Sequence, residues 1–357
     1  RNGDNVSPEM LAAATRDEAA VADVFKRFGA AALDDAMVAA PPVPARAWVA
    51  PQKPDARWPL QLAPITLEAY QKEAAAWKKK HGAKYRHEAT RASVPEPPLG
   101  PEQRAAGRAL LPSLRHVANA RRDGLARQET RQQYMAPLAD RVQMHFLLHG
   151  AGGTGKSHLM RVLCTVMEAE GLGGVVFSAF TGVAVTALPQ PCATYCTLFG
   201  LDGDSGSEGK KTYGPPSAMK RARFEQIVRD AKELSLLVLD EASFLGTPHL
   251  HHLDVRLRHL LDCQQPFGGL VLLLAGDFHQ LQPVGGYALH ASLVVEDVAP
   301  LTLKALNIPR GKQSVDGADR KGAALFREFE RHELTLQMRA ADDKRHALHL
   351  EELRNGI

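Results

Sequence analysis

Residues 150–157 read Gly-Ala-Gly-Gly-Thr-Gly-Lys-Ser, a spacing that can hold the phosphates of a nucleotide. An apolar run precedes this loop and a helix-length segment follows it. Glycines let backbone N–H groups turn toward phosphate oxygens, and the positive end of the next helix faces the same charge. Lys156 can then reach the outer phosphates and Ser157 can hold Mg²⁺. The alternative, a flexible glycine-rich turn, does not explain why Lys and Ser stand where the chemistry needs them.

The predicted nucleotide-binding residues are those of the loop itself: Gly150, Ala151, Gly152, Gly153, Thr154, Gly155, Lys156 and Ser157.

Two carboxylates follow another apolar run, at Asp240 and Glu241. Asp240 can share Mg²⁺ with Ser157, and Glu241 can orient and deprotonate an attacking water, which is most of what phosphoryl transfer requires. An isolated Asp-Glu pair is usually a solvated turn. A pair that ends a buried strand downstream of a phosphate loop is much less common, so we predict a catalytic role for both.

A third polar element, residues 276–284, reads Gly-Asp-Phe-His-Gln-Leu-Gln-Pro-Val and again follows an apolar run. The Gln280 amide can hydrogen-bond both a terminal phosphate and a water, so it can report whether that phosphate is present. The alternative is an ordinary strand-to-loop turn.

Four short apolar runs, residues 144–149, 175–179, 236–240 and 270–275, alternate with helix-length segments. This alternation predicts an α/β fold with a parallel sheet covered by helices on both faces. Ligands of such sheets bind at the carboxyl ends of the strands, where all three motifs fall.

The N-terminal part of the chain differs in amino-acid composition. Residues 1–64 are rich in Ala and Pro, which predicts a short helix near Ser7–Ala32 and then an extended linker. Thr66–His87 is predicted to be helical with Thr66 as its cap. Glu102–Leu111 is predicted to be a helix that ends near Pro112, and Gly203–Pro216 an exposed loop or small insertion.

Composition narrows the class of protein. With 357 residues, 45% of them hydrophobic and 24% charged, the chain is long enough for about two soluble domains. It shows neither a bilayer-length apolar run nor a signal-peptide pattern, so we expect no membrane partner and an intracellular protein that is not secreted. Four scattered cysteines favour a reducing compartment, and neither the pair Cys192 and Cys196 nor the histidines at 249, 251 and 252 predict a structural metal.

The net charge of +4 neither requires nor excludes nucleic acid. Residues 77–87 interleave Trp, Tyr and His with Lys and Arg, which suits stacking on bases and pairing with phosphates. The other interpretation, a solvated helix end, stays open.

Several motifs together resemble superfamily-1 helicases, and within them the PIF-type (petite integration frequency) 5′→3′ DNA helicases. Residues 276–284 look like motif III of that group and residues 240–244 look like motif II. Residues 254–269 are similar to the segment that distinguishes PIF-type proteins from RecD-like relatives. Further resemblances, in the family's order, are residues 99–103 (the adenine-reading Q motif), 178–184 (motif Ia), 194–199 (a DNA-contacting motif) and 334–339 (motif IV).

The resemblance implies a role for each matching residue. It assigns the adenine edge to Gln103, the γ-phosphate to Arg339, and ATP with Mg²⁺ to the phosphate loop. It also implies contacts with single-stranded DNA at Thr181, Gly182, Thr194, Thr197 and Phe199, although a core position is an equal alternative for Phe199.

Two departures from the family pattern stand out. Cys196 replaces the usual His, which weakens one expected DNA contact. The Arg-rich stretch Arg115–Tyr134 reads as an insertion that separates Gln103 from the phosphate loop by more than the usual distance.

The resemblance covers residues 99–357 and implies a P-loop NTPase with a RecA-like parallel sheet, the first lobe of a helicase, with the second RecA-like lobe missing. Residues 1–98 are expected to form a partly disordered, mostly helical or irregular N-terminal extension.

The implied function is an ATP-dependent 5′→3′ DNA helicase that acts on single-stranded DNA and DNA junctions in repair, recombination and telomere maintenance. We expect it in the nucleus, with the mitochondrion as the alternative, and the sequence does not predict its oligomeric state. The competing interpretation is a truncated or transposon-derived module that binds nucleotide and single-stranded DNA without unwinding. A GTPase is disfavoured because the chain has no Asn-Lys-x-Asp motif.

Overall fold

The computed structural model describes residues 62–86, 96–139, 141–186, 188–189, 191–199, 204–205, 211–212, 216–228, 233–278, 283, 288–289 and 317–338. The predicted helix near residues 7–32, Gln280 and Arg339 lie outside these residues.

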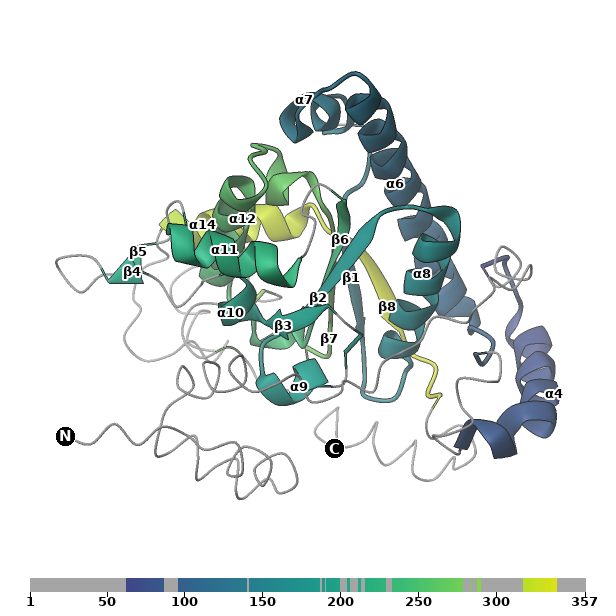
Figure 1. Ribbon diagram of the computed structural model, residues 1–357. Coiled ribbons are helices and arrows are strands. Elements are labelled where there is room, and N and C mark those ends of the chain that lie inside the picture. Colours follow the sequence, from purple (N-terminus) through teal and green to yellow (C-terminus); the bar gives the residue numbers. More distant parts are fainter. Residues whose placement is uncertain are drawn as a thin grey trace.

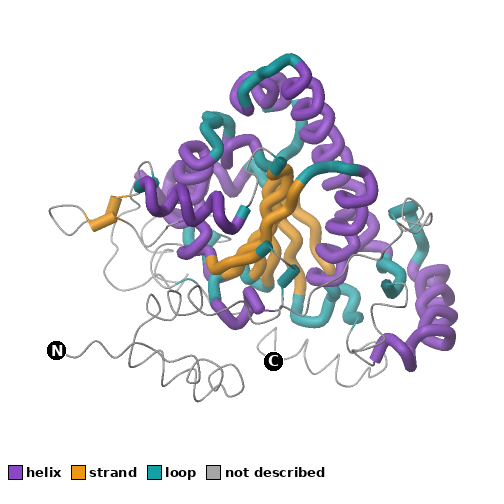
Figure 2. Tube along the Cα trace, viewed as in Figure 1, coloured by secondary structure: helices purple, strands orange, loops and turns teal. Residues whose placement is uncertain are grey.

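Six strands form one sheet in the centre of the molecule (Figures 1 and 2). They are β1 (His145–Gly150), β2 (Gly174–Ala179), β3 (Cys192–Thr194), β6 (Leu234–Asp240), β7 (Val271–Gly276) and β8 (Glu330–Leu334). Their order is β3-β2-β6-β7-β1-β8, and every neighbouring pair is parallel. The four predicted apolar runs are therefore confirmed as β1, β2, β6 and β7.

The strand side chains alternate between two cores. In β1, Phe146 and Leu148 point into one hydrophobic cluster and Leu147 into the other. In β7, Leu273 and Leu272 divide in the same way. A strand that is buried on both faces carries apolar residues at every position, which is why these strands appear in the sequence as continuous apolar runs.

Helices cover both faces of the sheet, as Figure 1 shows. On one face lie α6 (Pro101–Ala126) and α8 (Lys156–Glu170), whose leucines enter the first cluster. On the other lie α10 (Tyr195–Phe199), α11 (Ala218–Ile227), α12 (Thr247–Leu260) and α14 (Gly317–Arg327). The predicted α/β class with helices on both faces is confirmed.

The shorter elements sit at the ends of these layers. They are α7 (Arg131–Met135), α9 (Gly182–Thr186) and the 3₁₀ turns η1 (Ala136–Leu138), η2 (Ala242–Phe244) and η3 (Pro266–Gly269). Within the segment predicted to be an exposed loop or small insertion, β4 (Asp204–Ser205) pairs with β5 (Lys211–Thr212) as a separate antiparallel hairpin.

The prediction that a helix ends near Pro112 is wrong, because α6 runs through Pro112 to Ala126. A proline inside a helix costs about 3 kcal/mol. Leucines and valines on both sides of Pro112 are buried in the first cluster, and each fully buried one contributes about 1.5–3 kcal/mol. Burial of the whole helix face therefore outweighs the interruption; the buried residues are Leu110, Leu111, Leu114, Val117 and Ala118.

The Arg-rich stretch Arg115–Tyr134 forms the second half of α6 and most of α7. Two of its arginines donate hydrogen bonds to main-chain carbonyls at the sheet. Arg121 donates to the Glu233 carbonyl at 2.7 Å, and Arg131 donates to the carbonyls of Leu234, Gly268 and Gly269. These carbonyls lie next to the amino ends of β6 and β7, so the two arginines tie α6 and α7 to the start of these strands.

Helix α4 (Leu67–Arg86) packs near the amino end of α6, where Arg104 of α6 pairs with Glu73 of α4 at 2.8 Å. The Thr66 hydroxyl accepts a hydrogen bond from the Ala69 N–H, which confirms it as the cap. In this helix Trp77 makes an edge-on contact with Tyr85, and Lys78, Lys79 and Lys80 are exposed. Among the described residues, the helices lack an apolar stretch long enough to cross a bilayer.

Candidate nucleotide site and adjoining surface

The loop of residues 150–155 connects β1 to α8, and its backbone needs glycine at two points. Gly153 and Gly155 have φ of 89° and 87°, a conformation that residues with a side chain rarely adopt. Gly155 then begins α8, and its carbonyl accepts from His158 and Leu159. The turn therefore delivers the chain directly into the amino end of a 15-residue helix, whose unpaired N–H groups attract anions.

Space for a phosphate lies beside Gly152. A Cβ built on Gly152 would meet nothing within 4 Å, whereas one built on Gly150 would collide with the Leu334 carbonyl. Packing within the protein thus explains Gly150, while Gly152 borders open space. The Lys156 ammonium donates to the carbonyls of Gly150 at 2.7 Å and Ala151 at 3.1 Å, so it lies over the loop. The donors, the open space and the positive charge together fit a triphosphate.

The two carboxylates at the end of β6 lie within the electrostatic reach of Lys156. Burial raises the pKa of Asp240, opposed by a 2.9 Å hydrogen bond from the Glu241 N–H and by the charge of Lys156. Burial and the nearby Asp240 charge raise the pKa of Glu241, again opposed by Lys156. The structure therefore brings Lys156, at the start of α8, close to Asp240 and Glu241, at the end of β6.

Glu241 has a strained backbone, with φ of 59°. Non-glycine residues adopt this conformation only when their surroundings hold them there, and such residues cluster at functional sites. The turn that follows is η2, which also packs against the end of β7, because a Cβ on Gly276 would meet the Ala242 N–H nitrogen at 2.9 Å. The sequence does not reveal this strain.

The ligands predicted for Mg²⁺ are the Ser157 hydroxyl and the Asp240 carboxylate. Both are hard oxygen donors, which suits an ion that binds one or two protein groups and keeps several waters. Within the described part of the chain, no group of three or more His, Cys, Asp or Glu side chains is arranged to hold a metal. The hydroxyl and carboxylate oxygens of Ser157 and Asp240 are of the chemical type that magnesium binds beside a nucleotide.

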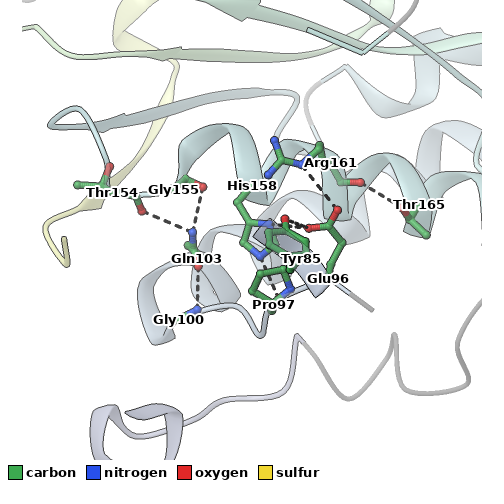
Figure 3. A network of polar contacts seen from close by, with 10 residues as sticks. All are labelled: Tyr85, Glu96, Pro97, Gly100, Gln103, Thr154, Gly155, His158, Arg161 and Thr165. Carbon is green, nitrogen blue, oxygen red and sulfur yellow. Dashed lines mark hydrogen bonds and ion pairs between the residues drawn. The ribbon is translucent and has the colours of Figure 1, made fainter. Parts of the chain in front are cut away.

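Gln103 reaches the phosphate loop from the first turn of α6 (Figure 3). Its Oε1 accepts from the Gly100 N–H at 2.8 Å, and its Nε2 donates to the Gly155 carbonyl at 2.9 Å. Only 1% of this residue is exposed. The fold thus places Gln103 against the loop despite the long intervening sequence, and its amide fixes the position of the loop relative to α6.

A second network in Figure 3 surrounds His158, the residue after Ser157. Its Nε2 lies 3.0 Å from the Pro97 carbonyl and its Nδ1 lies 3.4 Å from Glu96. Glu96 also accepts from the Tyr85 hydroxyl at 3.0 Å. Burial would raise the pKa of Glu96, but hydrogen bonds and charges from His158, with help from Arg161 and Tyr85, hold it below the ordinary value. The first turn of α8 is therefore connected to the end of α4.

Met338 is a contact of the phosphate loop that the sequence did not suggest. Its N–H donates to the Gly153 carbonyl at 3.0 Å, and its sulfur lies 3.1 Å from the Tyr70 hydroxyl. Nothing in the type of residue signals this contact, because it is made by the backbone of a segment far along the chain.

The residues predicted to contact DNA lie at the carboxyl ends of β2 and β3, at the same edge of the sheet as the phosphate loop. The Thr181 hydroxyl accepts from the Ala184 N–H, next to Gly182 at the start of α9. Thr194 bonds both the hydroxyl and the N–H of Thr197. Phe199 is 1% exposed.

Phe199 packs in the second core with Tyr195, so its ring supports this surface from inside. Of the two interpretations of Phe199, its burial favours the core aromatic. Thr181 and Thr194 cap the short helices that follow them, and Thr194 is buried.

Comparison with known proteins gives the following findings. Residues 134–299 match the model of the PIF1-like helicase family. The chain is 32% identical over 141 residues to the ATP-dependent DNA helicase PIF7 of Trypanosoma brucei brucei, covering 40% of this chain and 13% of that protein. It is 34% identical over 137 residues to the ATP-dependent DNA helicase PIF1 of Saccharomyces cerevisiae, covering 38% and 15%.

Among solved structures, Bacteroides Pif1 bound to single-stranded DNA is similar with a TM-score of 0.41 and 23% identity, covering 63% of this chain and 45% of that one. The Pif1 helicase of Candida albicans gives a TM-score of 0.40 and 21% identity, covering 64% and 44%. The chain thus spans less than a sixth of the two curated relatives and less than half of these solved chains.

Proposed function

We propose that the protein is an ATP-dependent DNA helicase, because residues 134–299 match the model of the PIF1-like helicase family. Its curated relatives carry that name. The observation that carries the proposal is the grouping of Lys156, Asp240 and Glu241 around a loop with room for phosphates. In the proposed reaction, ATP hydrolysis drives movement along single-stranded DNA, and unwinding proceeds 5′→3′ as in the PIF-type family.

Each residue has a physical task in this reaction. Lys156 holds the outer phosphates, and Glu241, with its raised pKa, accepts the proton of the attacking water. Ser157 and Asp240 would hold Mg²⁺, which when bound neutralises charge on the phosphates. Gln280 reports whether the γ-phosphate is present, and Arg339 contacts that phosphate. Gln103 is the residue proposed for the adenine edge.

We further propose single-stranded DNA and DNA junctions as partners, contacted through Thr181, Gly182, Thr194 and Thr197. The hydroxyls and the amino ends of α9 and α10 suit sugar and phosphate groups, which position a strand without reading its sequence. A role in repair, recombination and telomere maintenance would place the protein in the nucleus, or in the mitochondrion, and imaging of the tagged protein tests this.

The decisive experiment is Lys156→Ala in the intact protein. We expect DNA-stimulated ATP hydrolysis to be abolished, because no other described cation takes the place of Lys156 over the loop. Lys321→Ala, an exposed lysine of α14 on the other side of the sheet, is the matched control and should leave hydrolysis unchanged. Hydrolysis that survives Lys156→Ala would contradict the proposal. Binding of nucleotide and single-stranded DNA by the unmutated protein without any unwinding would favour the alternative of a non-motor binding module.

A further inference from the structure

Glu102, in the first turn of α6, reaches the chain where it leaves β8. Its Oε2 accepts from the N–H groups of Thr335 at 2.8 Å and Leu336 at 3.1 Å. Its Oε1 accepts from the Thr335 hydroxyl at 2.5 Å. One carboxylate thus receives three hydrogen bonds from a segment more than 230 residues further along the sequence, and hydrogen bonds to a charged acceptor are stronger than neutral ones.

The same segment rests on the phosphate loop at its other end, through the hydrogen bond from the Met338 N–H to the Gly153 carbonyl. A Cβ on Gly100 would come within 2.5 Å of the Met338 methyl carbon, so this passage is tightly packed. Residues 335–338 are therefore held at the start by Glu102 and at the end by the loop.

Two neighbouring side chains of α6 consequently hold two distant parts of the site. Glu102 holds residues 335 and 336, and Gln103 holds the loop at Gly155. The simpler interpretation is that Glu102 stabilises the start of its own helix, as acidic residues in a first turn do. That role alone does not require two main-chain N–H groups from another segment to converge on its carboxylate.

We propose that Glu102 is a positioning residue for phosphoryl transfer, which fixes residues 335–338 on the phosphate loop so that residue 339 follows from a defined point. This inference rests on the proposed function, in which Arg339 contacts the γ-phosphate. Residues 335–338 lead directly into residue 339, so the role proposed for Arg339 depends on a segment that Glu102 holds in place. A misplacement of about 1 Å at a reacting group can reduce a rate by about 10²-fold.

The test compares kcat and nucleotide affinity in the intact protein. In Glu102→Ala we expect kcat for DNA-stimulated ATP hydrolysis to fall by roughly 10- to 100-fold. The affinity for ADP with Mg²⁺ should stay within about twofold, because ADP lacks the phosphate that Arg339 contacts and Glu102 does not touch the loop itself. A structural role alone would lower both quantities together.

Glu102→Gln is the conservative variant. Its amide oxygen can accept from both N–H groups, and its NH₂ can donate to the Thr335 hydroxyl, so we expect kcat within about threefold of the unmutated protein. Glu102→Asp, one methylene shorter, should be impaired. If Glu102→Ala does not fold, the contrast between Gln and Asp decides, and equal kcat values for these two variants would overturn the inference.

The two proposals fail separately. If Lys156→Ala is inactive while Glu102→Ala keeps full kcat, only the positioning role is wrong. If Lys156→Ala remains active, the proposed function itself is wrong, whatever Glu102→Ala does.

Discussion

The phosphate loop and the segment proposed to contact DNA (Thr181, Gly182, Thr194 and Thr197, the DNA side) lie at the same edge of the sheet. They are stabilised in different ways. Distant parts of the chain hold the loop, with Gln103 bonded to Gly155 and Met338 to Gly153. The hydroxyls of Thr181 and Thr194 instead accept from N–H groups three residues further along, those of Ala184 and Thr197. Groups from distant segments hold the loop, whereas the threonine side chains cap the short helices that follow them.

The difference fits the task proposed for each region. A site that aligns a phosphate with a water needs its groups held to within a fraction of an ångström, and long-range contacts supply that. A surface along which a DNA strand moves needs repeated, shallow contacts instead. The carboxylates add a second contrast, because burial raises the pKa of Asp240 and of Glu241 and so opposes their charged forms, whereas burial of Phe199 contributes stability.

The largest expected effect is on chemistry at the phosphate side. In Glu241→Gln, the amide cannot accept the proton of the attacking water, so we expect kcat for ATP hydrolysis to fall by about 10²–10⁴-fold with nucleotide affinity retained. Single-turnover hydrolysis and equilibrium nucleotide binding measure the two. Glu225→Gln, an exposed position of α11, is the control. A parallel loss of affinity and rate would indicate that Glu241 positions the nucleotide rather than the water.

The next largest effect is on the stability of the DNA side, where Phe199 is buried. Phe199→Ala should lower the free energy of unfolding by about 3–5 kcal/mol, the usual result of removing a buried aromatic ring. Urea unfolding measures this, and Val183→Ala, at a side chain that is 64% exposed, should change stability by less than about 0.5 kcal/mol. If Phe199→Leu keeps its stability yet loses DNA affinity, the interpretation of Phe199 as a core residue is wrong, since that result would mean direct contact with the strand.

The smallest effect concerns the stability of the phosphate side. The pKa of Asp240 is raised in the folded state, so the folded protein binds more protons than the unfolded chain just above the ordinary carboxyl pKa. The free energy of unfolding must then fall as the pH rises from about 4 through the raised pKa of Asp240.

Removing this charge should therefore stabilise the protein. Without nucleotide or Mg²⁺, we expect Asp240→Asn to stabilise the protein at pH 7, and the gain should vanish below about pH 4. Thermal unfolding across pH measures this difference. A loss of stability in Asp240→Asn at pH 7 would show that the surroundings of Asp240 favour its charged form, which would contradict the raised pKa.

The sequence was informative where the signal is local. The phosphate loop, the Asp-Glu pair and four strands each depend on residues close together in the chain, and all four strands lie where they were predicted. The prediction for helix α6 was too short because Pro112 is a strong local signal for a helix end. The burial that outweighs this signal involves the whole sheet. The contacts of Glu102 with residue 335 and of Met338 with Gly153 have no spacing that could reveal them. Strand β8 was not predicted because its exposed edge position leaves it with charged residues instead of an apolar run.

The two outermost strands have a consequence for the behaviour of the protein in solution. Open strand edges are templates for intermolecular pairing and aggregation. Here β3 is only three residues long, and β8 carries Glu330, Arg331 and Glu333 on a mostly exposed strand. Short length on one side and charge on the other discourage a second molecule from adding its own strand, so the sheet is protected against fibril-like growth at both ends.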